Sequence, residues 1–349
     1  MLVAEVIEVT DRWNATHDVV VIGGGAAGLS GAVALARSRR SVVVVDAGAP
    51  RNAPAEGVHV LLGREGIAPG ALLELGREEL RGYGGEVISG EVTGAVRDGD
   101  GFAVTLADGR VLRARRLLVT TGLADEFPDV AGLRERWGRD VLHCPYCHGW
   151  EVRDRRIGVL STGPMSVHQA LLMRQLSEDV VFFAHTAPEI GAEDRERLAA
   201  RGIEVVEGEV VAVDSAEDRL TGVRLADGRV VEREAVAIAT RMVARAGFLA
   251  ELGLVVREHP MGVGEHVHTE FGGRTEVPGV WAAGNVTDLV AQVGAAAAAG
   301  TMAGAQINGD LVMEEADRAV AGARAGAGFS AEAEAEAHVM VAGERRHGL

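Results

Sequence analysis

The stretch that decides the fold is His17–Gly48, HDVVVIGGGAAGLSGAVALARSRRSVVVVDAG. Its first apolar run, Val19–Ile22, is short and β-branched, as in strands buried inside a parallel sheet. Helix-forming residues fill Ala26–Arg37, and Val42–Val45 form a second buried run. A strand, a glycine turn, a helix and a strand in this order predict the β-α-β unit of a doubly wound α/β fold.

The glycine turn of this unit carries the spacing G-x-G-x-x-G at Gly23, Gly25 and Gly28, and Asp46 closes the next strand. The first glycine permits a tight turn, the second lets the backbone approach a pyrophosphate, and the third lets the helix pack closely. The N–H groups that open the helix attract an anion, and the acid accepts hydrogen bonds from ribose hydroxyls. The complete context predicts a dinucleotide site rather than a merely tight turn.

A second unit of the same kind is expected further along the chain, with strands at Ile157–Leu160 and Val180–Phe183 and a helix after Pro164. Two of the three glycines are missing, because Ser161 and Ser166 stand at their positions. Pro164 also removes an N–H group, and neither an acid nor an arginine follows the second strand. This unit is predicted to keep the fold while its nucleotide site is eroded, which argues against NAD(P)H binding.

At 349 residues the chain exceeds the usual size of a single core, so two domains are expected. A hairpin is predicted to turn at Asp108 and Gly109 and to lead into a buried strand ending at Gly122. Much the same pattern recurs with a turn at Asp227 and Gly228. The repeat indicates an internal duplication of architecture.

Composition excludes several classes of function. The net charge of -16 disfavours nucleic acids and anionic membranes as partners. Every basic residue is arginine, which excludes lysine Schiff bases and a P-loop lysine. No apolar run suggests a membrane span, and the first residues lack a secretory signal pattern, so a cytoplasmic location is expected. Residues Glu314–Leu349 are expected to form a loosely packed helical or disordered tail.

The segment His143–Trp150, HCPYCHGW, holds the only two cysteines. A zinc site needs four ligands and there is no second C-x-x-C, while a static disulfide would close too short a loop to stabilise the fold much. Redox use fits best, because thiols at this spacing can form a disulfide without backbone rearrangement. A helix starting near the second cysteine, Cys147, would lower a thiolate pKa, and His148 could take up and return a proton.

Together these features resemble the low-molecular-weight thioredoxin reductase family of FAD-dependent pyridine nucleotide-disulfide oxidoreductases, over His17–Val312. The resemblance is carried by VVVIGGGAAGL, LLVTTG, the C-x-x-C, and VPGVWAAGNV with QVGAAAAAG. It implies two doubly wound Rossmann-like domains, the second inserted into the first. We expect the FAD-binding domain at 1–122 and 246–313, the inserted NAD(P)-type domain with the C-x-x-C at 123–245, and the tail at 314–349.

The resemblance also implies roles for individual residues. Those expected to hold FAD are Gly23, Gly25, Gly28 and Asp46 at its ADP half, Gly122 at its border, Gly284 and Asn285 at the ribityl chain and pyrophosphate, and Gln292 and Val293 at the pyrimidine edge of the flavin. Cys147 is then the thiol beside the flavin, and Cys144 the one that exchanges with substrate. His148 and Asn285 stand where the family usually has aspartate, and His148 is expected to act as the proton acceptor.

The motif CPYCHGWE beside an eroded nicotinamide site resembles the dithiol oxidase branch of the family. We therefore expect an FAD-dependent enzyme that forms a disulfide in a small-molecule dithiol with O2 as electron acceptor, as a homodimer. One alternative is an NAD(P)H-dependent reductase that passes electrons to a thioredoxin-like protein, and another is a non-enzymatic flavoprotein or metal-binding scaffold. Tyr146 and Trp150 either shape an apolar mouth or pack at a domain seam, and His143 has no assigned role.

Overall fold

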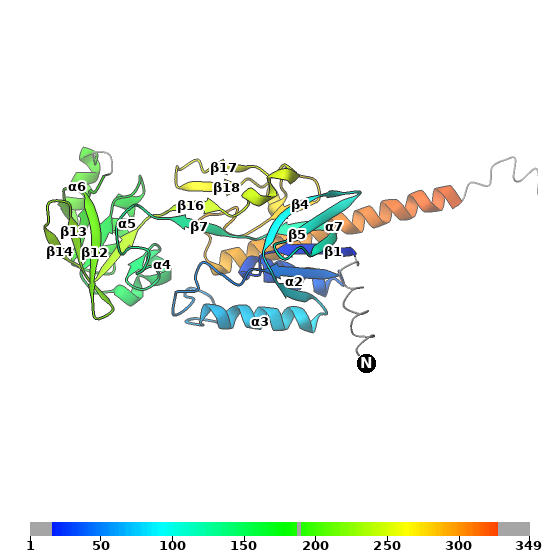
Figure 1. Cartoon of the computed structure of the whole chain (residues 1–349), viewed down its shortest axis with the longest axis horizontal. Helices are drawn as coiled ribbons and strands as arrows, with labels where there is room; N and C mark the ends of the chain where they lie inside the picture. Colours follow the sequence, from blue (N-terminus) through cyan, green and yellow to red (C-terminus); the bar gives the residue numbers. More distant parts are fainter. Residues whose placement is uncertain (1–15, 187–189, 327–349) are drawn as a thin grey trace, which may run out of the picture.

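The computed structural model describes residues 16–186 and 190–326. The N-terminal stretch in which no secretory signal was found and the end of the expected tail lie outside these residues. The described chain forms an elongated molecule, with two sheet domains side by side and one long helix projecting at the far end (Figure 1).

The larger domain is built on a seven-stranded sheet ordered β3-β2-β1-β6-β5-β4, with β19 also paired to β6. Strands β3, β2, β1, β6 and β19 are parallel, and β5 and β4 extend the sheet as antiparallel strands. The bounds are β1 Thr16–Ile22, β2 Val42–Asp46, β3 Glu86–Ser89, β4 Val92–Asp98, β5 Gly101–Leu106, β6 Val111–Val119 and β19 Val280–Ala282. Because β19 comes from far along the chain, two separate segments build this domain.

The smaller domain has a parallel five-stranded sheet, β11-β10-β9-β15-β8, beside an antiparallel sheet of β12, β13 and β14. Its first four strands follow the order of β3, β2, β1 and β6, but its edge strand β8 comes first in the domain, whereas β19 comes last in the larger one. The bounds are β8 Val141–Leu142, β9 Ile157–Leu160, β10 Val180–Phe183, β11 Glu204–Val206, β12 Val210–Ala216, β13 Arg219–Leu225, β14 Val230–Glu232 and β15 Ala235–Ile238. Two doubly wound domains, the second inserted into the first, are confirmed. The two hairpin repeats differ in one respect: β6 continues from hairpin to central strand, whereas β14 and β15 are separate.

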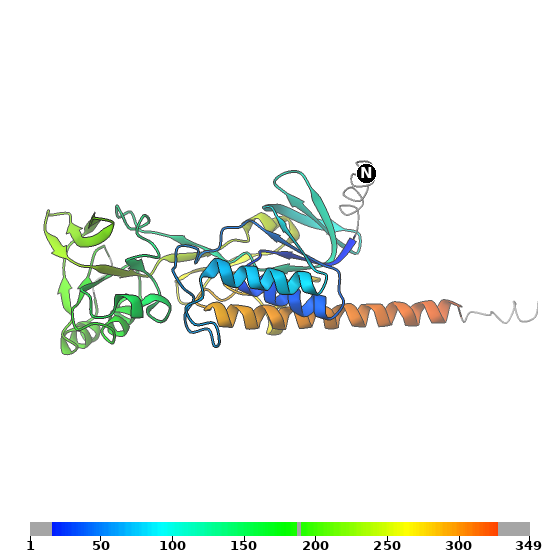
Figure 2. The same cartoon turned by 90° about the horizontal axis from the view of Figure 1, so that it is seen from below.

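A fourth sheet connects the domains, in the order β17-β18-β16-β7. Strand β7 leads into the inserted domain and β16 returns from it, and the two pair antiparallel. The bounds are β7 Leu123–Glu126, β16 Arg241–Ala244, β17 Val256–Glu258 and β18 Gly264–Val267. Strands β7 and β16 run along the narrow connection between the inserted domain and the larger one, which is also seen from below (Figures 1 and 2).

The helices cover the sheets and position the glycine turn. They are α2 Ala26–Arg37, α3 Pro69–Gly82, α4 Pro145–His148, α5 Ser166–Met173, α6 Ala192–Ala200 and α7 Val293–Gly326, with 3-10 turns η1 Trp150–Val152, η2 Gly247–Leu252 and η3 Phe271–Gly273. Helix α7 packs tightly on α2, since a Cβ at Gly300 would lie 1.9 Å from the carbonyl oxygen of Ala27. Within residues 16–186 and 190–326, none of the helices combines the length and apolar character that crossing a membrane requires.

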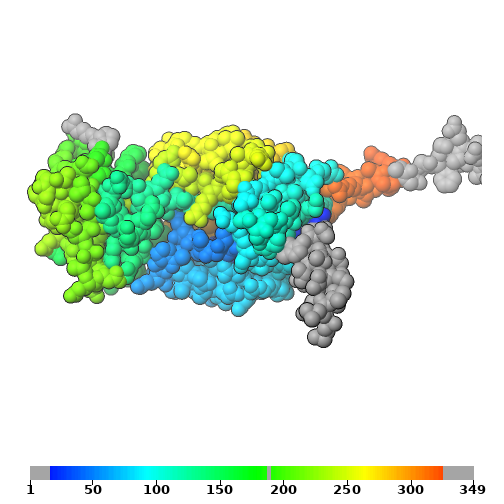
Figure 3. Space-filling view, in the orientation of Figure 1, coloured from blue at the N-terminus to red at the C-terminus, as the bar shows by residue number. Residues whose placement is uncertain are grey.

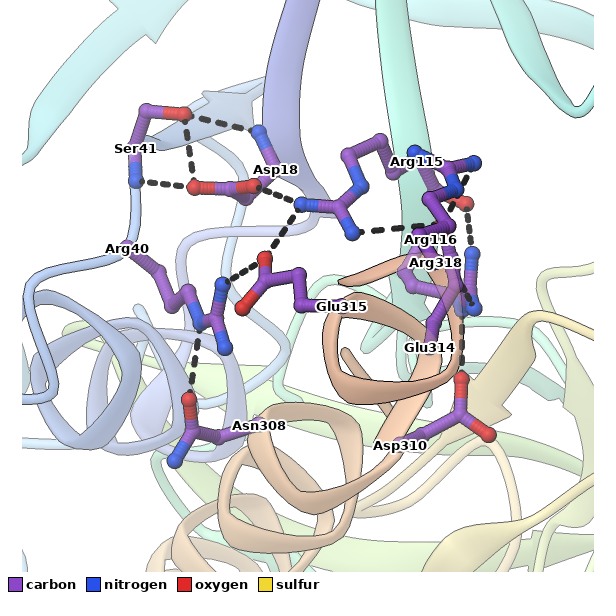
Figure 4. A network of polar contacts seen from close by, with 10 residues as sticks. All are labelled: Asp18, Arg40, Ser41, Arg115, Arg116, Asn308, Asp310, Glu314, Glu315 and Arg318. Atoms are coloured by element: carbon purple, nitrogen blue, oxygen red, sulfur yellow. Dashed lines mark hydrogen bonds and ion pairs between the residues drawn. The ribbon is translucent and has the colours of Figure 1, made fainter. Parts of the chain in front are cut away.

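Helix α7 runs through the boundary expected at residue 313. Glu314 forms ion pairs with Arg115 and Arg116, and Glu315 binds Arg115 at 2.8 Å and also Arg40 (Figure 4). The start of the expected tail is therefore fastened to the sheet domain rather than loosely packed. The segment is rich in alanine and glutamate, and this composition did not indicate that its glutamates would form ion pairs with arginines of the sheet domain.

Candidate functional site

The two domains enclose a cavity of about 570 Å³ at the carboxyl ends of β1, β2 and β8. This is the edge of a parallel sheet where ligands bind in doubly wound folds. The expected site residues that line it are Gly23, Gly25, Asp46, Gly122, Cys144, Cys147, His148, Gly284, Asn285, Gln292 and Val293. Gly28 is the one expected site residue that does not line the cavity.

The glycines of the first turn act in three different ways. Gly23 has φ 109° and a Cβ there would lie 2.4 Å from the carbonyl oxygen of Thr120, so the turn needs glycine. A Cβ at Gly25 would meet no atom within 4 Å, which leaves this backbone open to the cavity, next to the unpaired N–H groups of the α2 N-terminus. A Cβ at Gly28 would lie 1.9 Å from the carbonyl oxygen of Gly23, so Gly28 allows helix packing.

Asp46 is held in place at the end of β2. Its carboxylate accepts hydrogen bonds from the backbone N–H groups of Gly24 and Gly48, at 3.4 and 3.2 Å. Arg77 of α3 donates a third hydrogen bond at 2.9 Å. Arg77 was not expected at this site, because it lies 31 residues from Asp46 in the sequence and belongs to no motif. The arrangement orients the carboxylate for a ribose at the cavity wall.

Thr121 supplies a polar group that the sequence reasoning missed. Its hydroxyl is buried without a hydrogen-bond partner among the described residues, and the residue lines the cavity beside Gly122. A buried hydroxyl without a partner at a cavity wall is a contact for a polar ligand. With the open backbone at Gly25 and the oriented Asp46, it makes this wall fit FAD.

Asn285 shapes the far wall of the cavity. Its side-chain Nδ2 donates to the carbonyl oxygens of Asp288 and Ala291, at 3.0 and 2.9 Å. These bonds fold the loop that places Gln292 directly before α7. The amide nitrogen of Asn285 is thus occupied within the protein, and its side-chain oxygen remains the group that could meet the cofactor.

The two cysteines differ because of the short helix between them. Helix α4 begins at Pro145, earlier than expected, so that Cys144 becomes the N-cap and accepts the backbone N–H of Cys147 at 3.2 Å. A hydrogen bond from the Cys147 side chain, with backbone N–H groups and the amide of Gln292, lowers the pKa of Cys144 to about 6 against the effect of burial. The same bond and burial raise the pKa of Cys147. Cys144 is therefore the thiolate of the pair near neutral pH.

His148 lies on the cavity wall together with a histidine that was not expected, His59. Burial lowers the pKa of His148, while Glu151 opposes this effect and His59 adds to it. His59 comes from the loop between β2 and α3, where no periodicity or motif marked it. Among the residues that the structure describes, no three histidine, cysteine, aspartate or glutamate side chains gather in a way that could hold a metal ion.

His143 also lines the cavity, beside Arg51. Its Nδ1 lies 3.1 Å from the carbonyl oxygen of Ile238, and burial lowers its pKa with the help of the Arg51 charge. Arg51 binds Asp125 through two hydrogen bonds of 2.7 Å. His143 and Arg51 thus lie on the cavity wall that carries Cys147. The Arg51 charge lowers the pKa of Cys147, but the hydrogen bond to Cys144 and burial, which raise this pKa, are the larger effects.

The second glycine turn is closed by its own side chains. The Ser166 hydroxyl accepts the backbone N–H groups of Thr162 and Gly163, at 3.0 and 3.2 Å. The Thr162 hydroxyl donates to the carbonyl oxygen of Ala239 at 2.5 Å. Ser166 is 1% exposed, so its oxygen occupies the donors that a phosphate would need.

A family profile described as pyridine nucleotide-disulphide oxidoreductase matches residues 17–302. Among curated relatives, thioredoxin reductase tcpT of Claviceps purpurea is 30% identical, over 85% of this chain and 95% of the relative. Thioredoxin reductase sirT of Leptosphaeria maculans is 31% identical, over 83% and 93%. The solved structure of HlmI is 49% identical with a TM-score of 0.83, covering 89% of this chain and 98% of HlmI.

Proposed function

We propose that this chain, which belongs to the pyridine nucleotide-disulphide oxidoreductase family, is a dithiol oxidase. It is a thioredoxin reductase-like, FAD-dependent redox enzyme. In the proposal it closes a disulfide in a small-molecule dithiol and delivers the two electrons to O2. We place this reaction in the cytoplasm and expect a homodimer.

The observation that carries the proposal is the contrast between the two glycine turns. The turn at Gly25 is open to the cavity, whereas Ser166 closes the turn at Thr162 and Gly163. A reductase fed by NAD(P)H needs both turns to bind a pyrophosphate. An enzyme that takes its electrons from a dithiol needs the first turn alone.

The cysteines perform the thiol chemistry in two steps. A substrate thiolate attacks Sγ of Cys144 in the Cys144–Cys147 disulfide, and Cys147 leaves as a thiolate. The second substrate thiol then closes the product disulfide, and Cys144 leaves. The low pKa of Cys144 favours this second step, because a thiol of low pKa is the better leaving group. His148 takes up a proton released by the substrate thiols.

Bound FAD supplies the two-electron acceptor that returns the cysteines to a disulfide and hands the electrons to O2. Over a full cycle one dithiol and one O2 become one disulfide and one H2O2. The chain holds FAD through the turn at Gly25, Asp46 and the wall around Gly122 and Asn285.

The proposal is tested with the purified yellow protein and small dithiols, dithiothreitol among them, in the absence of oxygen. We expect the flavin to bleach with a dithiol and to recover when air is admitted, with one H2O2 per disulfide. The variant Cys144→Ser should lose bleaching while it keeps its bound FAD. If no dithiol bleaches the flavin, the proposal fails.

The alternative function is an NAD(P)H-dependent reductase, and the names of the two fungal relatives favour it. Rapid bleaching of the flavin by micromolar NADPH without oxygen would establish this alternative. Because Ser166 occupies the N–H groups that a phosphate would need, we expect NADPH not to reduce the flavin within the time that a dithiol takes to reduce it.

A further inference from the structure

His143 is the residue directly before Cys144, and the thiol exchange described above does not use its side chain. Both residues line the same cavity at the seam between the two domains. In the space-filling view, the blue surface of the larger domain borders the green surface of the inserted domain (Figure 3). His143 thus adds a second titratable ring, besides His148, to the part of the cavity wall that carries the cysteines.

The His143 ring is held at the end of β15. Its Nδ1 lies 3.1 Å from the carbonyl oxygen of Ile238, which can only accept, so Nδ1 carries the hydrogen of the neutral ring. Gln169 of α5 donates through Nε2 to the same oxygen at 3.3 Å and to the carbonyl oxygen of His143 at 2.6 Å. Ile238 is fully buried and Gln169 is 7% exposed, so the ring and the backbone of His143 are both anchored in the interior of the inserted domain.

The other ring nitrogen of His143, Nε2, is open. It has no hydrogen-bond partner among the described residues, and it is not one of the fully buried polar atoms that lack a partner there. Because the ring lines the cavity and Nδ1 carries the hydrogen, Nε2 presents a lone pair to the cavity. A lone pair fixed at a cavity wall can accept a proton from a bound ligand.

The surroundings of His143 keep its ring neutral near pH 7. Burial and the charge of Arg51 lower its pKa, against the opposing effects of the Ile238 carbonyl group and Asp125. Arg51 belongs to the loop after β2 and Asp125 to β7, whereas α5 and β15 contribute the uncharged Gln169 and Ile238. A neutral imidazole is the form that takes up a proton.

The chemistry of thiol exchange fixes the side from which the substrate approaches. A thiolate attacks a disulfide in line with the bond that breaks, so the substrate sulfur and the two cysteine sulfurs lie in a row. The attacking sulfur therefore approaches Cys144 from the side that faces away from Cys147. His148 follows Cys147, whereas His143 precedes Cys144. A base for the attacking thiol is thus needed on the Cys144 side of the pair.

The reaction releases two protons, one from each substrate thiol. In the first step the bond between Cys144 and Cys147 breaks, the substrate sulfur binds Cys144, and Cys147 leaves with the electron pair. In the second step the other substrate sulfur forms the product disulfide, and Cys144 leaves with the electron pair. Each thiol must be ionised to attack, so two protons pass to the protein before O2 takes up two electrons and two protons as H2O2.

We propose that His143 is a catalytic base of the dithiol site, whose Nε2 takes the proton from the substrate thiol that attacks Cys144. This inference rests on the proposed dithiol oxidase function. His148, beside Cys147, remains the acceptor for the other proton. The two histidines on either side of the C-x-x-C then share the two protons of one dithiol.

The test measures flavin reduction by dithiothreitol in FAD-loaded protein, in a single turnover without oxygen, from roughly pH 6 to pH 9. In His143→Asn the side-chain amide takes the place of Nδ1 and can still donate to Ile238, while Nε2 is removed. We expect its rate to fall about a hundredfold near pH 6.5 and to come within about threefold of the original near pH 9, where dithiothreitol ionises by itself. His168→Gln, which replaces an exposed histidine of α5, is the matched control and should follow the original profile.

A second dithiol separates proton transfer from packing. The thiols of bis(2-mercaptoethyl) sulfone are more acidic than those of dithiothreitol, so more of this substrate is ionised at a given pH. We expect the deficit of His143→Asn near pH 7 to be about fivefold smaller with the sulfone, because an ionised thiol needs no base. A deficit of the same size with both dithiols would show that His143 supports the structure around the cysteines and takes no proton.

Two further results would overturn the assignment. A profile of His143→Asn equal to that of His168→Gln would show that Nε2 has no part in the reaction, and a deficit of equal size at every pH would show a packing role. The flavin absorbance before the reaction confirms that each variant carries the same amount of FAD. If the original protein is bleached by neither dithiol, the oxidase proposal fails together with this one, whereas a bleached original protein with an unaffected His143→Asn overturns this inference alone.

Discussion

Cys144 and Cys147 are separated by two residues, yet their thiols respond oppositely to the same hydrogen bond. Cys144 accepts from the side chain and the backbone N–H of Cys147, which stabilises its thiolate. Cys147 is the donor, and the negative charge of its neighbour disfavours a second ionisation. The difference supports the proposed roles of the two cysteines in thiol exchange, which the C-x-x-C spacing alone does not distinguish.

We predict that iodoacetamide alkylates Cys144 of the reduced protein with a midpoint near the pKa of about 6, and Cys147 only in strongly alkaline solution. Cys147→Ala removes the side-chain donor, so the midpoint of Cys144 should rise toward that of an ordinary thiol. Mass spectrometry of the alkylated peptide measures both. Faster labelling of Cys147 than of Cys144, or an unmoved midpoint in Cys147→Ala, would contradict this assignment.

The residues that sequence reasoning could name are those whose role depends on near neighbours in the chain. Gly23, Gly25 and Asp46 stand at set distances from a strand and a helix, so a pattern identifies them. His59 belongs to no motif, because its environment is made by segments that meet in the folded protein. Thr121 lies within the motif LLVTTG, but the motif does not show that its hydroxyl is buried without a partner among the described residues. The sequence showed that serine replaces glycine at position 166. It did not show that the Ser166 hydroxyl would accept hydrogen bonds from the backbone N–H groups of Thr162 and Gly163.

Helices α2 and α7 hold the glycine turn at the cavity through glycines at their contact. A Cβ at Gly304 would lie 2.6 Å from the carbonyl oxygen of Gly31. The contact is with the backbone of α2, so no side chain could move aside to relieve it. A Cβ at Gly309, five residues further along α7, would meet nothing within 4 Å. The two glycines of one helix thus form a matched pair.

We predict that Gly304→Ala destabilises the protein by about 1–3 kcal/mol, because helices α2 and α7 must separate. Gly309→Ala should leave it unchanged or stabilise it by up to about 1 kcal/mol through higher helix propensity. Urea unfolding of both variants, with FAD added in equal excess, gives the comparison. Equal stability of the two variants would mean that the helices are not in the close contact described.

Elements with strong periodicity were predicted well, and short ones were not. The bounds expected for α2, β9 and β10 agree with the structure, since each is a run of helix-forming or buried β-branched residues. Strands β7 and β16 have four residues each and were not foreseen. Their pairing joins positions more than a hundred residues apart in sequence, and no local pattern predicts such a register.

The connection between the domains is reinforced by one ion pair beside the strands. Arg51, from the loop after β2, binds Asp125 of β7, and the Thr240 hydroxyl donates to the same carboxylate at 2.5 Å just before β16. The loop of the larger domain is therefore bound to β7, and Thr240 joins the same carboxylate to the segment that precedes β16. This fastening keeps the cysteines at the wall of the FAD cavity.

Burial favours the neutral form of Asp125, but hydrogen bonds from Arg51 and its charge outweigh burial and lower the pKa. The pair therefore stabilises the protein above the ordinary carboxyl pKa, and that stability is lost as the pH falls through the lower folded value. Arg51→Met leaves a carboxylate that is 6% exposed without its partner, and we expect a loss on the order of 3 kcal/mol at pH 7.

The double variant Arg51→Met with Asp125→Asn should regain most of that loss, because no unpaired charge remains. The difference between the original protein and Arg51→Met should begin to shrink as the pH falls below the ordinary carboxyl pKa of about 4, and it should be lost below the lower folded pKa of Asp125, where the carboxyl group is protonated in both proteins. Thermal unfolding of the single and double variants at both pH values measures the coupling between the residues. A loss that persists undiminished at low pH and in the double variant would show that Arg51 supports the loop by packing and not through its charge.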